Sequence, residues 1–312
     1  MSQFAFLFTG QGAQAVGMLN GFAGNPVVDQ TVQEASDALG FDLQRLIADG
    51  PKEDLDLTTN TQPVMLTAAV AVYRAWIAAG GPVPALVAGH SLGEYSALVA
   101  AGVIDFKDAV PLVRFRAQAM QEAVPVGVGA MYAILGLDGE AVRAGCLQVA
   151  AETGEVIEAV NFNDPKQTVI AGSKAGAEKA AEVLKAQGAK RALPLPVSAP
   201  FHSSLMKPAA ERLREKLAAV NFLPQAFPVI NNIDVAVTES ADALRDALYR
   251  QAFGPVRWVE VVQALKARGL NTLIECGPGK VLAGMAKRID ADIISTTVLD
   301  PASLAEAKNL LS

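Results

Sequence analysis

Residues 84–97, Pro-Ala-Leu-Val-Ala-Gly-His-Ser-Leu-Gly-Glu-Tyr-Ser-Ala, combine an apolar run, a serine between two glycines and a helix-like continuation. Gly89-His90-Ser91-Leu92-Gly93 matches the pattern G-x-S-x-G in the strand-to-helix context of a nucleophile elbow. The flanking glycines permit a sharp turn that raises the Ser91 hydroxyl at a sheet edge, beside a helix N-terminus. The alternative is a glycine-rich turn with a solvated serine. The context favours the elbow, so we predict that Ser91 is a nucleophile.

Short β-rich runs alternate with long alanine-rich helical stretches on both sides of this segment. The alternation predicts an α/β fold built on a mainly parallel sheet. We expect strands over residues 4–8, 85–88, 228–230 and 272–275, and helices over residues 63–79, 94–101, 105–123, 208–220 and 256–268.

A second pattern interrupts this alternation between Gly127 and Pro196. There we expect strand 130–135, helix 139–151, strand 156–162, strand 168–171, helix 175–187 and strand 191–195. This β-α-β-β-α-β order is typical of a ferredoxin-like unit. We therefore predict a small inserted domain over 127–196, a larger domain over 1–126 and 197–312, and a cleft where the two meet.

The composition excludes several classes of protein. The 312 residues carry a net charge of 26 − 32 = −6, and no apolar run approaches the ~18 residues that a membrane span needs. The charge argues against a broad nucleic-acid surface but leaves room for a local basic patch. The two cysteines, Cys146 and Cys276, are too few for a zinc cluster or a disulfide framework. Residues 4–8 follow an N-terminus without a basic region, so we expect a strand there, no signal peptide and a cytoplasmic protein. We expect no metal and no organic cofactor.

A serine hydroxyl needs a base near neutral pH, and the chain contains only two histidines. His90 adjoins Ser91 in a tight turn, where successive side chains diverge, so it is badly placed to take the proton. We expect it to pack beneath the elbow and to hold it with a hydrogen bond. His202, in a loop just after the predicted insert, is then the candidate base, although an isolated histidine is more often structural.

Two further glycine-rich turns match nucleotide motifs only in part. Residues 9–15, Thr-Gly-Gln-Gly-Ala-Gln-Ala, fit G-x-G-x-x-A after a strand, but no second strand with a terminal acidic residue follows. We expect instead that this loop brings the Gln11 backbone N–H near Ser91, where it and the Leu92 N–H could stabilise an oxyanion. Gly277-Pro278-Gly279-Lys280 lacks the spacing of a phosphate loop, and a structural turn is favoured.

Together these motifs resemble the malonyl-CoA:acyl carrier protein transacylases of type II fatty-acid synthesis. The resemblance extends over essentially the whole chain. It depends on five ordered motifs, namely Phe8-Thr9-Gly10-Gln11-Gly12, residues 89–97, Val160-Asn161-Phe162-Asn163, Phe201-His202-Ser203 with Leu205-Met206, and residues 275–282. One position departs from the family, which usually has proline where Thr9 stands.

The resemblance implies an α/β-hydrolase-like large domain and a role for each matching residue. It implies that Ser91 carries the acyl group, that His202 acts as base and then acid, and that Gln11 and Leu92 form the oxyanion hole. It also implies that Arg116 binds the malonyl carboxylate, which suits a planar guanidinium. The pattern alone does not choose between Arg116 and Arg114, which would point to another helix face.

The resemblance further implies that the backbone carbonyl of Gln251 orients His202 in place of a triad aspartate. The pair Phe201-His202 resembles the version associated with malonyl rather than methylmalonyl transfer.

The resemblance implies ping-pong transfer from malonyl-CoA, with CoA leaving, to the phosphopantetheine thiol of an acidic acyl carrier protein, for fatty-acid elongation. We expect a local basic surface for that partner, with Lys190-Arg191 and Lys287-Arg288 as candidates, although solvated charge explains them equally well or better. Two alternatives remain, an esterase or thioesterase and an inactive scaffold. The 110 residues after His202 argue against the first, because α/β-hydrolases usually place the histidine near the chain end.

Overall fold

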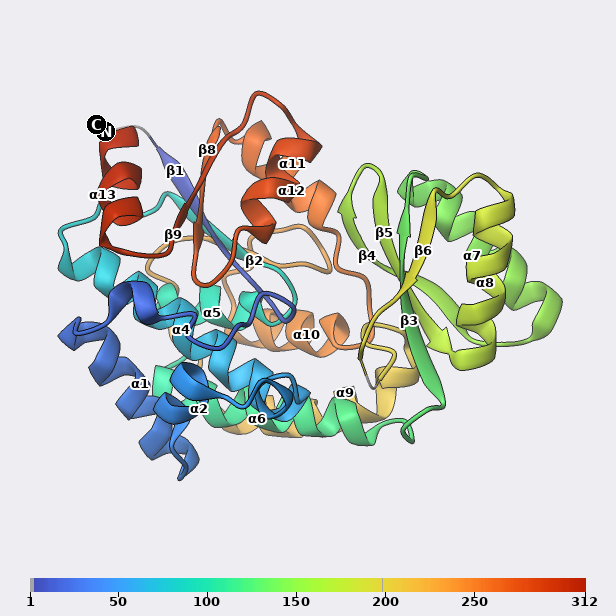
Figure 1. Cartoon of the computed structure of the whole chain (residues 1–312), viewed down its shortest axis with the longest axis horizontal. Helices are drawn as coiled ribbons and strands as arrows, with labels where there is room; N and C mark the ends of the chain where they lie inside the picture. The colour runs from blue at the N-terminus through green and yellow to red at the C-terminus, as the bar shows by residue number, and fades with distance from the viewer. Residues whose placement is uncertain (1–2, 198) are drawn as a thin grey trace.

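The protein contains two β-sheets, each flanked by helices (Figure 1). The computed structural model describes residues 3–197 and 199–312. The strands are β1 (Phe4–Phe8), β2 (Leu86–Gly89), β3 (Gly129–Leu135), β4 (Ile157–Asp164), β5 (Gln167–Ser173), β6 (Arg191–Pro194), β7 (Val229–Ile230), β8 (Thr272–Cys276) and β9 (Ile294–Val298).

The α-helices are α1 (Pro26–Leu39), α2 (Leu43–Asp49), α3 (Lys52–Leu55), α4 (Thr58–Ala78), α5 (Gly93–Ala100), α6 (Phe106–Glu122), α7 (Gly139–Thr153), α8 (Lys174–Ala186), α9 (Lys207–Ala219), α10 (Ala241–Gln251), α11 (Trp258–Ala267), α12 (Val281–Ile289) and α13 (Pro301–Leu310). Two short 3₁₀ turns, η1 (Asn20–Phe22) and η2 (Ser204–Met206), complete the assignment. Within the described part of the chain, no helix is both long and apolar enough to cross a membrane.

The main sheet is parallel throughout, with the strand order β7-β2-β1-β8-β9. This confirms the predicted α/β class and its parallel sheet. The outer strand β9 was not predicted, because its sequence Ile-Ser-Thr-Thr-Val is short, polar and mostly half-buried. Such an edge strand carries too weak a hydrophobic signal to be recognised from the sequence.

The alternation of side chains along β1 explains the two helical layers. Phe4, Phe6 and Phe8 pack on one face against α1, α4, α5 and α6. Ala5 and Leu7 pack on the opposite face against α11 and α12. Because both faces of the sheet are covered, every residue of β1 is buried, as expected for a central parallel strand. The carboxyl ends of β1 and β2 therefore open toward one edge of a rigid core.

The small sheet is antiparallel and has the order β4-β5-β3-β6. With α7 and α8 packed against it, it has the predicted β-α-β-β-α-β topology of a ferredoxin-like unit. Its own core contains Ile134, Val142, Cys146, Ile170 and Leu184. The proposed boundaries at residues 127 and 196 stay a prediction.

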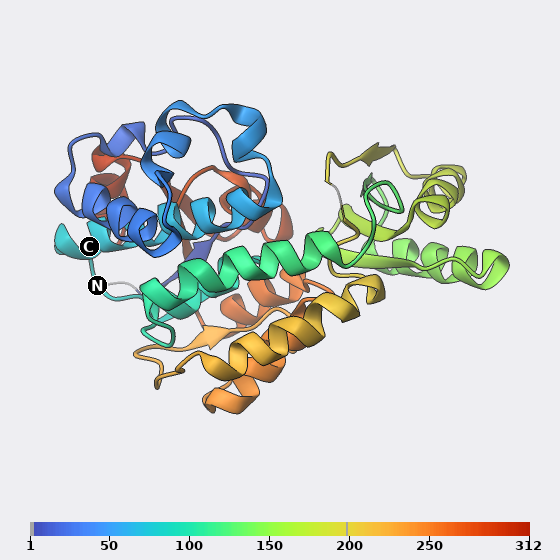
Figure 2. The ribbon, with the colours of Figure 1, turned by 90° about the horizontal axis from the view of Figure 1, so that it is seen from below.

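The two sheets are joined close to the carboxyl edge of the main sheet. Val256, just before α11, accepts a hydrogen bond from the Phe162 N–H at 3.0 Å and donates one to the Val160 carbonyl at 2.8 Å. Arg288 of α12 forms an ion pair with Asp164 at 2.7 Å. On the other side of the molecule, α6 and α9 run side by side toward the small sheet (Figure 2).

Most predicted boundaries differ from the observed ones by one or two residues, and the start of α4 differs most. Helix α4 begins at Thr58, upstream of Pro63, so the proline lies inside the helix instead of opening it. Helix α11 begins at Trp258, because Val256 is extended and bridges to β4. Strand β6 ends at Pro194, slightly before the expected limit.

Candidate active site

Ser91 lies in the sharp turn between β2 and α5. Its φ of 52° is in the left-handed region, which non-glycine residues rarely adopt. The flanking glycines are required by close backbone contacts. A Cβ on Gly89 would lie 1.9 Å from the Gly93 carbonyl carbon, and one on Gly93 would lie 2.0 Å from the Phe8 oxygen. The predicted nucleophile elbow is therefore present, and its strain is located at the serine.

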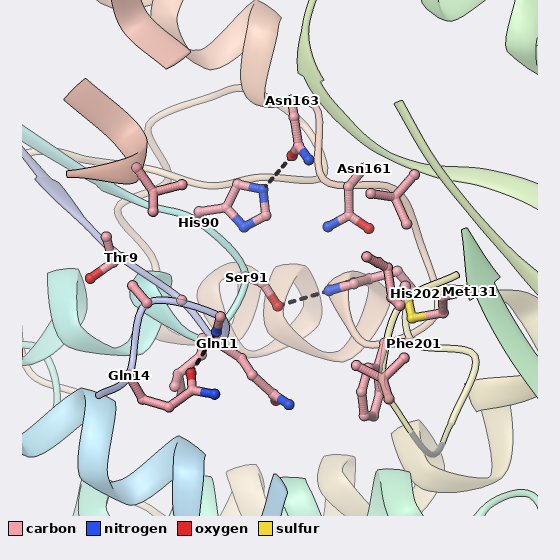
Figure 3. A pocket seen from close by; sticks show the side chains of 18 of the residues that line it. Thr9, Gln11, Gln14, His90, Ser91, Met131, Asn161, Asn163, Phe201 and His202 are labelled. Carbon is pink, nitrogen blue, oxygen red and sulfur yellow. Dashed lines mark hydrogen bonds between the residues drawn. The ribbon is translucent and has the colours of Figure 1, made fainter. Parts of the chain in front are cut away.

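The His202 side chain points at this hydroxyl from the segment before η2 (Figure 3). Its Nε2 lies 2.7 Å from Ser91 Oγ, and its Nδ1 lies 2.8 Å from the backbone oxygen of Gln251. Because that oxygen can only accept, Nδ1 carries the proton and Nε2 is free to accept one from the serine. His202 also has a positive φ, 67°. Ser91 and His202, both with a positive φ, thus share one hydrogen bond. His202 Nε2 lies close enough to the Ser91 hydroxyl to take its proton, as its choice as the base requires.

Burial keeps this imidazole neutral. Desolvation, together with the positive charge of Arg116, lowers the pKa of His202 to about 3. A neutral imidazole at ordinary pH is the form that can accept the Ser91 proton.

Arg116, on α6, is almost completely buried, with 1% of its surface exposed. It donates to Gln62 Oε1 at 2.9 Å, to Gln251 Oε1 at 3.0 Å and to Ser91 Oγ at 3.2 Å. Its Nε has no hydrogen-bond partner among the described residues. By contrast, Arg114 stacks on the Phe41 ring at 4.7 Å, on another side of the helix. The structure thus places Arg116, and not Arg114, beside Ser91.

His90 turns away from Ser91, as expected. Its Nε2 lies 2.8 Å from Asn163 Oδ1 of β4, and its ring packs on Trp258 at a centroid distance of 5.4 Å. Burial lowers the pKa of His90. The hydrogen-bond partner of His90 therefore comes from the small sheet, which the sequence did not indicate.

The loop after β1 lies directly against the elbow. A Cβ on Gly10 would lie 2.5 Å from the His90 oxygen and 3.7 Å from the Leu92 nitrogen. The Gln11 side chain donates to Thr58 Oγ1 at 3.2 Å, and the backbone N–H groups of Gln11 and Leu92 have no protein acceptor within residues 3–197 and 199–312. No helix opens from this loop, because only η1 precedes α1, so the arrangement is not that of a dinucleotide site.

A cavity of about 780 Å³ connects these groups. Its floor comes from the elbow and the loop after β1, and its far wall from β3, β4, β5 and the chain that follows β6 (Figure 3). The apolar wall includes Met120, Met131, Val169, Leu195 and Phe201. The predicted cleft between the two sheets is therefore present, and Ser91 lies in it.

The turn at residues 277–280 is structural in this fold. The Glu275 carboxylate accepts from the backbone N–H of Val281 at 3.0 Å and of Ala283 at 2.8 Å. It therefore satisfies the free amides at the start of α12 with a protein carboxylate, as a helix cap does. Burial raises the pKa of Glu275.

Sequence reasoning missed several buried side chains around the elbow. Asn232 accepts from the Ser91 N–H at 2.7 Å, and Glu94 and Gln62 belong to the same hydrogen-bonded cluster. One signal was available for Asn232. It follows the predicted strand 228–230, and the carboxyl ends of neighbouring parallel strands meet at one edge.

The fold and this site define an acyl transferase of the serine–histidine type. The family model described as acyl transferase domain matches residues 5–299. The chain belongs to the malonyl CoA-acyl carrier protein transacylase family. It is 53% identical to that transacylase of Escherichia coli strain K12 over 311 residues, which is 99% of this chain and 100% of the relative.

Solved structures agree with this assignment. The acyl-carrier-protein S-malonyltransferase of Burkholderia pseudomallei 1710b superposes with a TM-score of 0.97 at 65% identity, covering 99% of this chain and 100% of that one. A malonyl-transacylase in complex with a type II polyketide acyl-carrier protein superposes with a TM-score of 0.97 at 52% identity, again covering 99% and 100%.

Proposed function

We propose that this protein transfers the malonyl group of malonyl-CoA to the phosphopantetheine thiol of an acyl carrier protein, through an ester on Ser91. The observation that carries the proposal is that the Ser91 hydroxyl oxygen contacts both His202 and Arg116. Ser91 Oγ lies 2.7 Å from a neutral imidazole nitrogen and 3.2 Å from a buried guanidinium. A nucleophile with its base explains acyl transfer, and the adjacent buried cation explains a carboxylated acyl group.

The first half-reaction forms the ester. Ser91 Oγ attacks the thioester carbonyl carbon while His202 Nε2 takes the hydroxyl proton, and the Nδ1–H bond to the Gln251 carbonyl stabilises the resulting imidazolium. The carbonyl oxygen becomes an oxyanion, for which the Gln11 and Leu92 N–H groups are the proposed donors. Cleavage of the C–S bond releases CoA, whose sulfur takes the proton from His202.

The second half-reaction reverses these steps with another thiol. The phosphopantetheine thiol gives its proton to His202 and attacks the ester carbon, and Ser91 leaves with that proton. Water must be excluded as a competing nucleophile. We propose that Arg116 holds the malonyl carboxylate with the N–H that bonds Ser91 Oγ in this structure, so that the ester carbonyl faces the thiol.

The similarity to transacylases, one of them solved with a carrier protein, supports an acyl carrier protein as the acceptor. We propose that the enzyme supplies fatty-acid elongation and works in the cytoplasm. The second proposal is supported by two free and buried thiols, Cys146 and Cys276.

A loading experiment tests the proposal. The protein is incubated with malonyl-CoA labelled in the malonyl group, quenched in acid, and digested for peptide mapping, with Ser91→Ala as control. We expect label on the Ser91 peptide, none in the variant, and transfer to holo-acyl carrier protein when it is added. Label on another peptide, or its release as free malonate without transfer to the carrier protein, would overturn the proposal. The latter outcome would indicate a thioesterase.

A further inference from the structure

We propose that Glu94 is a positioning residue that holds the nucleophile through Asn232 and the carboxylate-binding Arg116 through Gln251. The inference rests on the proposed function, because it assigns Arg116 to the malonyl carboxylate. Glu94 lies in the first turn of α5, immediately after the elbow, and only 2% of its surface is exposed. One oxygen of this carboxylate, Oε2, accepts from the backbone N–H of Asn232 at 2.9 Å and from Gln251 Nε2 at 2.9 Å.

The first branch of this network fixes the backbone of the nucleophile. The Asn232 side chain accepts from the Ser91 N–H at 2.7 Å and donates to the Gly89 carbonyl at 2.7 Å. It therefore bridges the two sides of the elbow with one amide. Because a left-handed serine costs on the order of 1–3 kcal/mol, the surrounding structure must hold it in place. Glu94 fixes the position of the Asn232 backbone from which this bridge extends.

The second branch fixes the guanidinium. Gln251 Nε2 donates both to Glu94 Oε2 and to the Ser91 carbonyl at 3.0 Å, while its Oε1 accepts from Arg116 at 3.0 Å. The Ser91 carbonyl and the Glu94 oxygen that carries no proton can only accept, and Arg116 can only donate, so the three contacts allow one orientation of the amide. A flipped amide would point an N–H group at the guanidinium. By binding the amide nitrogen, Glu94 therefore orients the Gln251 side chain so that its oxygen, Oε1, points at Arg116.

The cost of burying Glu94 supports a role beyond packing. Gln251 and Asn232 are fully buried as well, so the network lies in a region where an ionised carboxylate is strongly desolvated. Glu94 has no direct ion pair among the residues that the structure describes. Its connection to the only buried arginine of the described residues runs through the Gln251 amide.

Substitutions that cut one branch at a time test the inference. Acyl-enzyme formation is measured with malonyl-CoA and with acetyl-CoA, which lacks the carboxylate, for Asn232→Ala, Gln251→Leu, Glu94→Ala and Glu94→Gln. Gln251→Leu keeps the backbone carbonyl that orients His202. The matched control is Glu140→Ala, which removes an exposed first-turn glutamate from α7.

The two branches predict different selectivities. We expect Asn232→Ala to lower kcat/KM about tenfold for both donors, because it removes the amide that bonds both the Ser91 N–H and the Gly89 carbonyl. Gln251→Leu should lower it about tenfold more for malonyl-CoA than for acetyl-CoA, since the lost bond to the Ser91 carbonyl affects both donors alike and only the lost bond to Arg116 separates them. Glu94→Ala should combine both patterns, and Glu94→Gln should restore most of the malonyl rate, because one amide oxygen can accept both bonds. Glu140→Ala should match the wild type.

Equal losses for both donors in Gln251→Leu and Glu94→Ala would overturn the inference, and so would wild-type kinetics in Glu94→Ala. Should Glu94→Ala fail to fold, the contrast between Asn232→Ala and Gln251→Leu still decides it. Failure of the wild-type protein to form a malonyl-serine would instead overturn the proposed function.

Discussion

Arg116 is a buried cation that pairs with no acidic side chain of residues 3–197 and 199–312. Its hydrogen-bond partners in the described part of the chain are two amide oxygens and the Ser91 hydroxyl. Neutral partners satisfy a guanidinium without neutralising its charge, and under the proposed function the malonyl carboxylate would supply the missing counterion.

We therefore predict that Arg116→Ala lowers kcat/KM for malonyl-CoA by about 10- to 100-fold, the value of a hydrogen bond to a charged group, and changes acetyl-CoA much less. Arg116→Lys should not restore the malonyl rate, because an ammonium lacks the planar fork. Arg114→Ala, which lies on the same helix, is the control and should load both donors normally. Equal losses for the two donors in Arg116→Ala would remove the carboxylate role.

Glu94 should make the stability of the fold depend on pH. Burial raises the pKa of Glu94 to about 7, with Arg116 opposing and Asp234 adding to the rise. The folded state thus binds this proton more tightly than the unfolded chain, whose pKa is 4.5. Its contribution to stability is complete below pH 4.5 and is lost as the pH rises through 7.

We predict that the free energy of unfolding of the wild type, relative to Glu94→Gln, falls by about 3 kcal/mol between pH 4.5 and pH 8. Urea unfolding of both proteins across this range measures the difference. Arg116 and Asp234 are present in both proteins, so their own titration cancels. A difference that does not change with pH would show that Glu94 does not titrate in this range.

The sequence identified the reacting groups better than the groups that hold them. The choice of Ser91 as the nucleophile follows from the G-x-S-x-G motif, and the choice of His202 as the base follows from elimination between the two histidines. The choice of Arg116 over Arg114 needed the family resemblance. Asn232 was not predicted, because an asparagine after a strand is an ordinary turn residue until the register of β7 and β2 is known.

At the scale of the elements, the elbow works because α5 begins in contact with the end of β1. A Cβ on Gly93 would meet the Phe8 oxygen at 2.0 Å and the Phe8 carbon at 2.7 Å, and neither backbone atom can move without displacing the central strand.

We predict that Gly93→Ala abolishes loading of Ser91 and lowers the free energy of unfolding by about 3 kcal/mol, at the upper end of overpacking costs. The control is Gly284→Ala in α12, where the nearest atom, at 3.3 Å, is the end of the flexible Arg288 side chain. That variant should be as stable as the wild type or slightly more stable, since alanine is the better helix former. Normal loading by Gly93→Ala would show that the elbow tolerates displacement.

The elements that sequence patterns predicted well are those with a continuous apolar signal, such as β1 and α6. The errors lie where tertiary contacts override a local rule. Pro63 was expected to open a helix, yet α4 extends upstream to Thr58, where its first turn faces the site through Gln11. Val256 has a helical spacing, but its backbone pairs with β4.

At the scale of the whole molecule, the contacts between the two sheets converge on the site. The His90–Asn163 hydrogen bond and the Arg288–Asp164 ion pair both tie β4 to the main fold. Ser91 and the loop after β1 come from the main sheet and His202 from the segment between β6 and η2, whereas β3, β4 and β5 close the cavity opposite Ser91. The orientation of the small sheet therefore sets the width of the cleft.

A second, smaller groove lies at the same junction. It is lined by Leu135, Gly136, Asp164, Lys166, Gln167, Lys190 and Arg288, and Gln167 also lines the main cavity. One member of each predicted basic pair, Lys190 and Arg288, thus lies in one groove. Lys166 and Lys190 are exposed and have no ion pair among residues 3–197 and 199–312. This is the surface that we expect an acidic carrier protein to meet beside the cavity mouth.

Salt should therefore separate the two half-reactions. Raising ionic strength from 0.05 to 0.5 M shortens the Debye length from roughly 14 to 4 Å, which screens exposed charges at the groove but not the buried Arg116. We predict that transfer to holo-acyl carrier protein slows about tenfold over this range while loading from malonyl-CoA changes little.

Lys190→Glu should raise the KM for the carrier protein severalfold and flatten the salt response. The control is Lys107→Glu, which reverses another exposed charge, in the first turn of α6 at the end of that helix farther from the small sheet. This variant should leave both rates unchanged. A transfer rate that does not respond to salt, or a Lys190→Glu variant with the wild-type KM, would place the carrier protein elsewhere on the molecule.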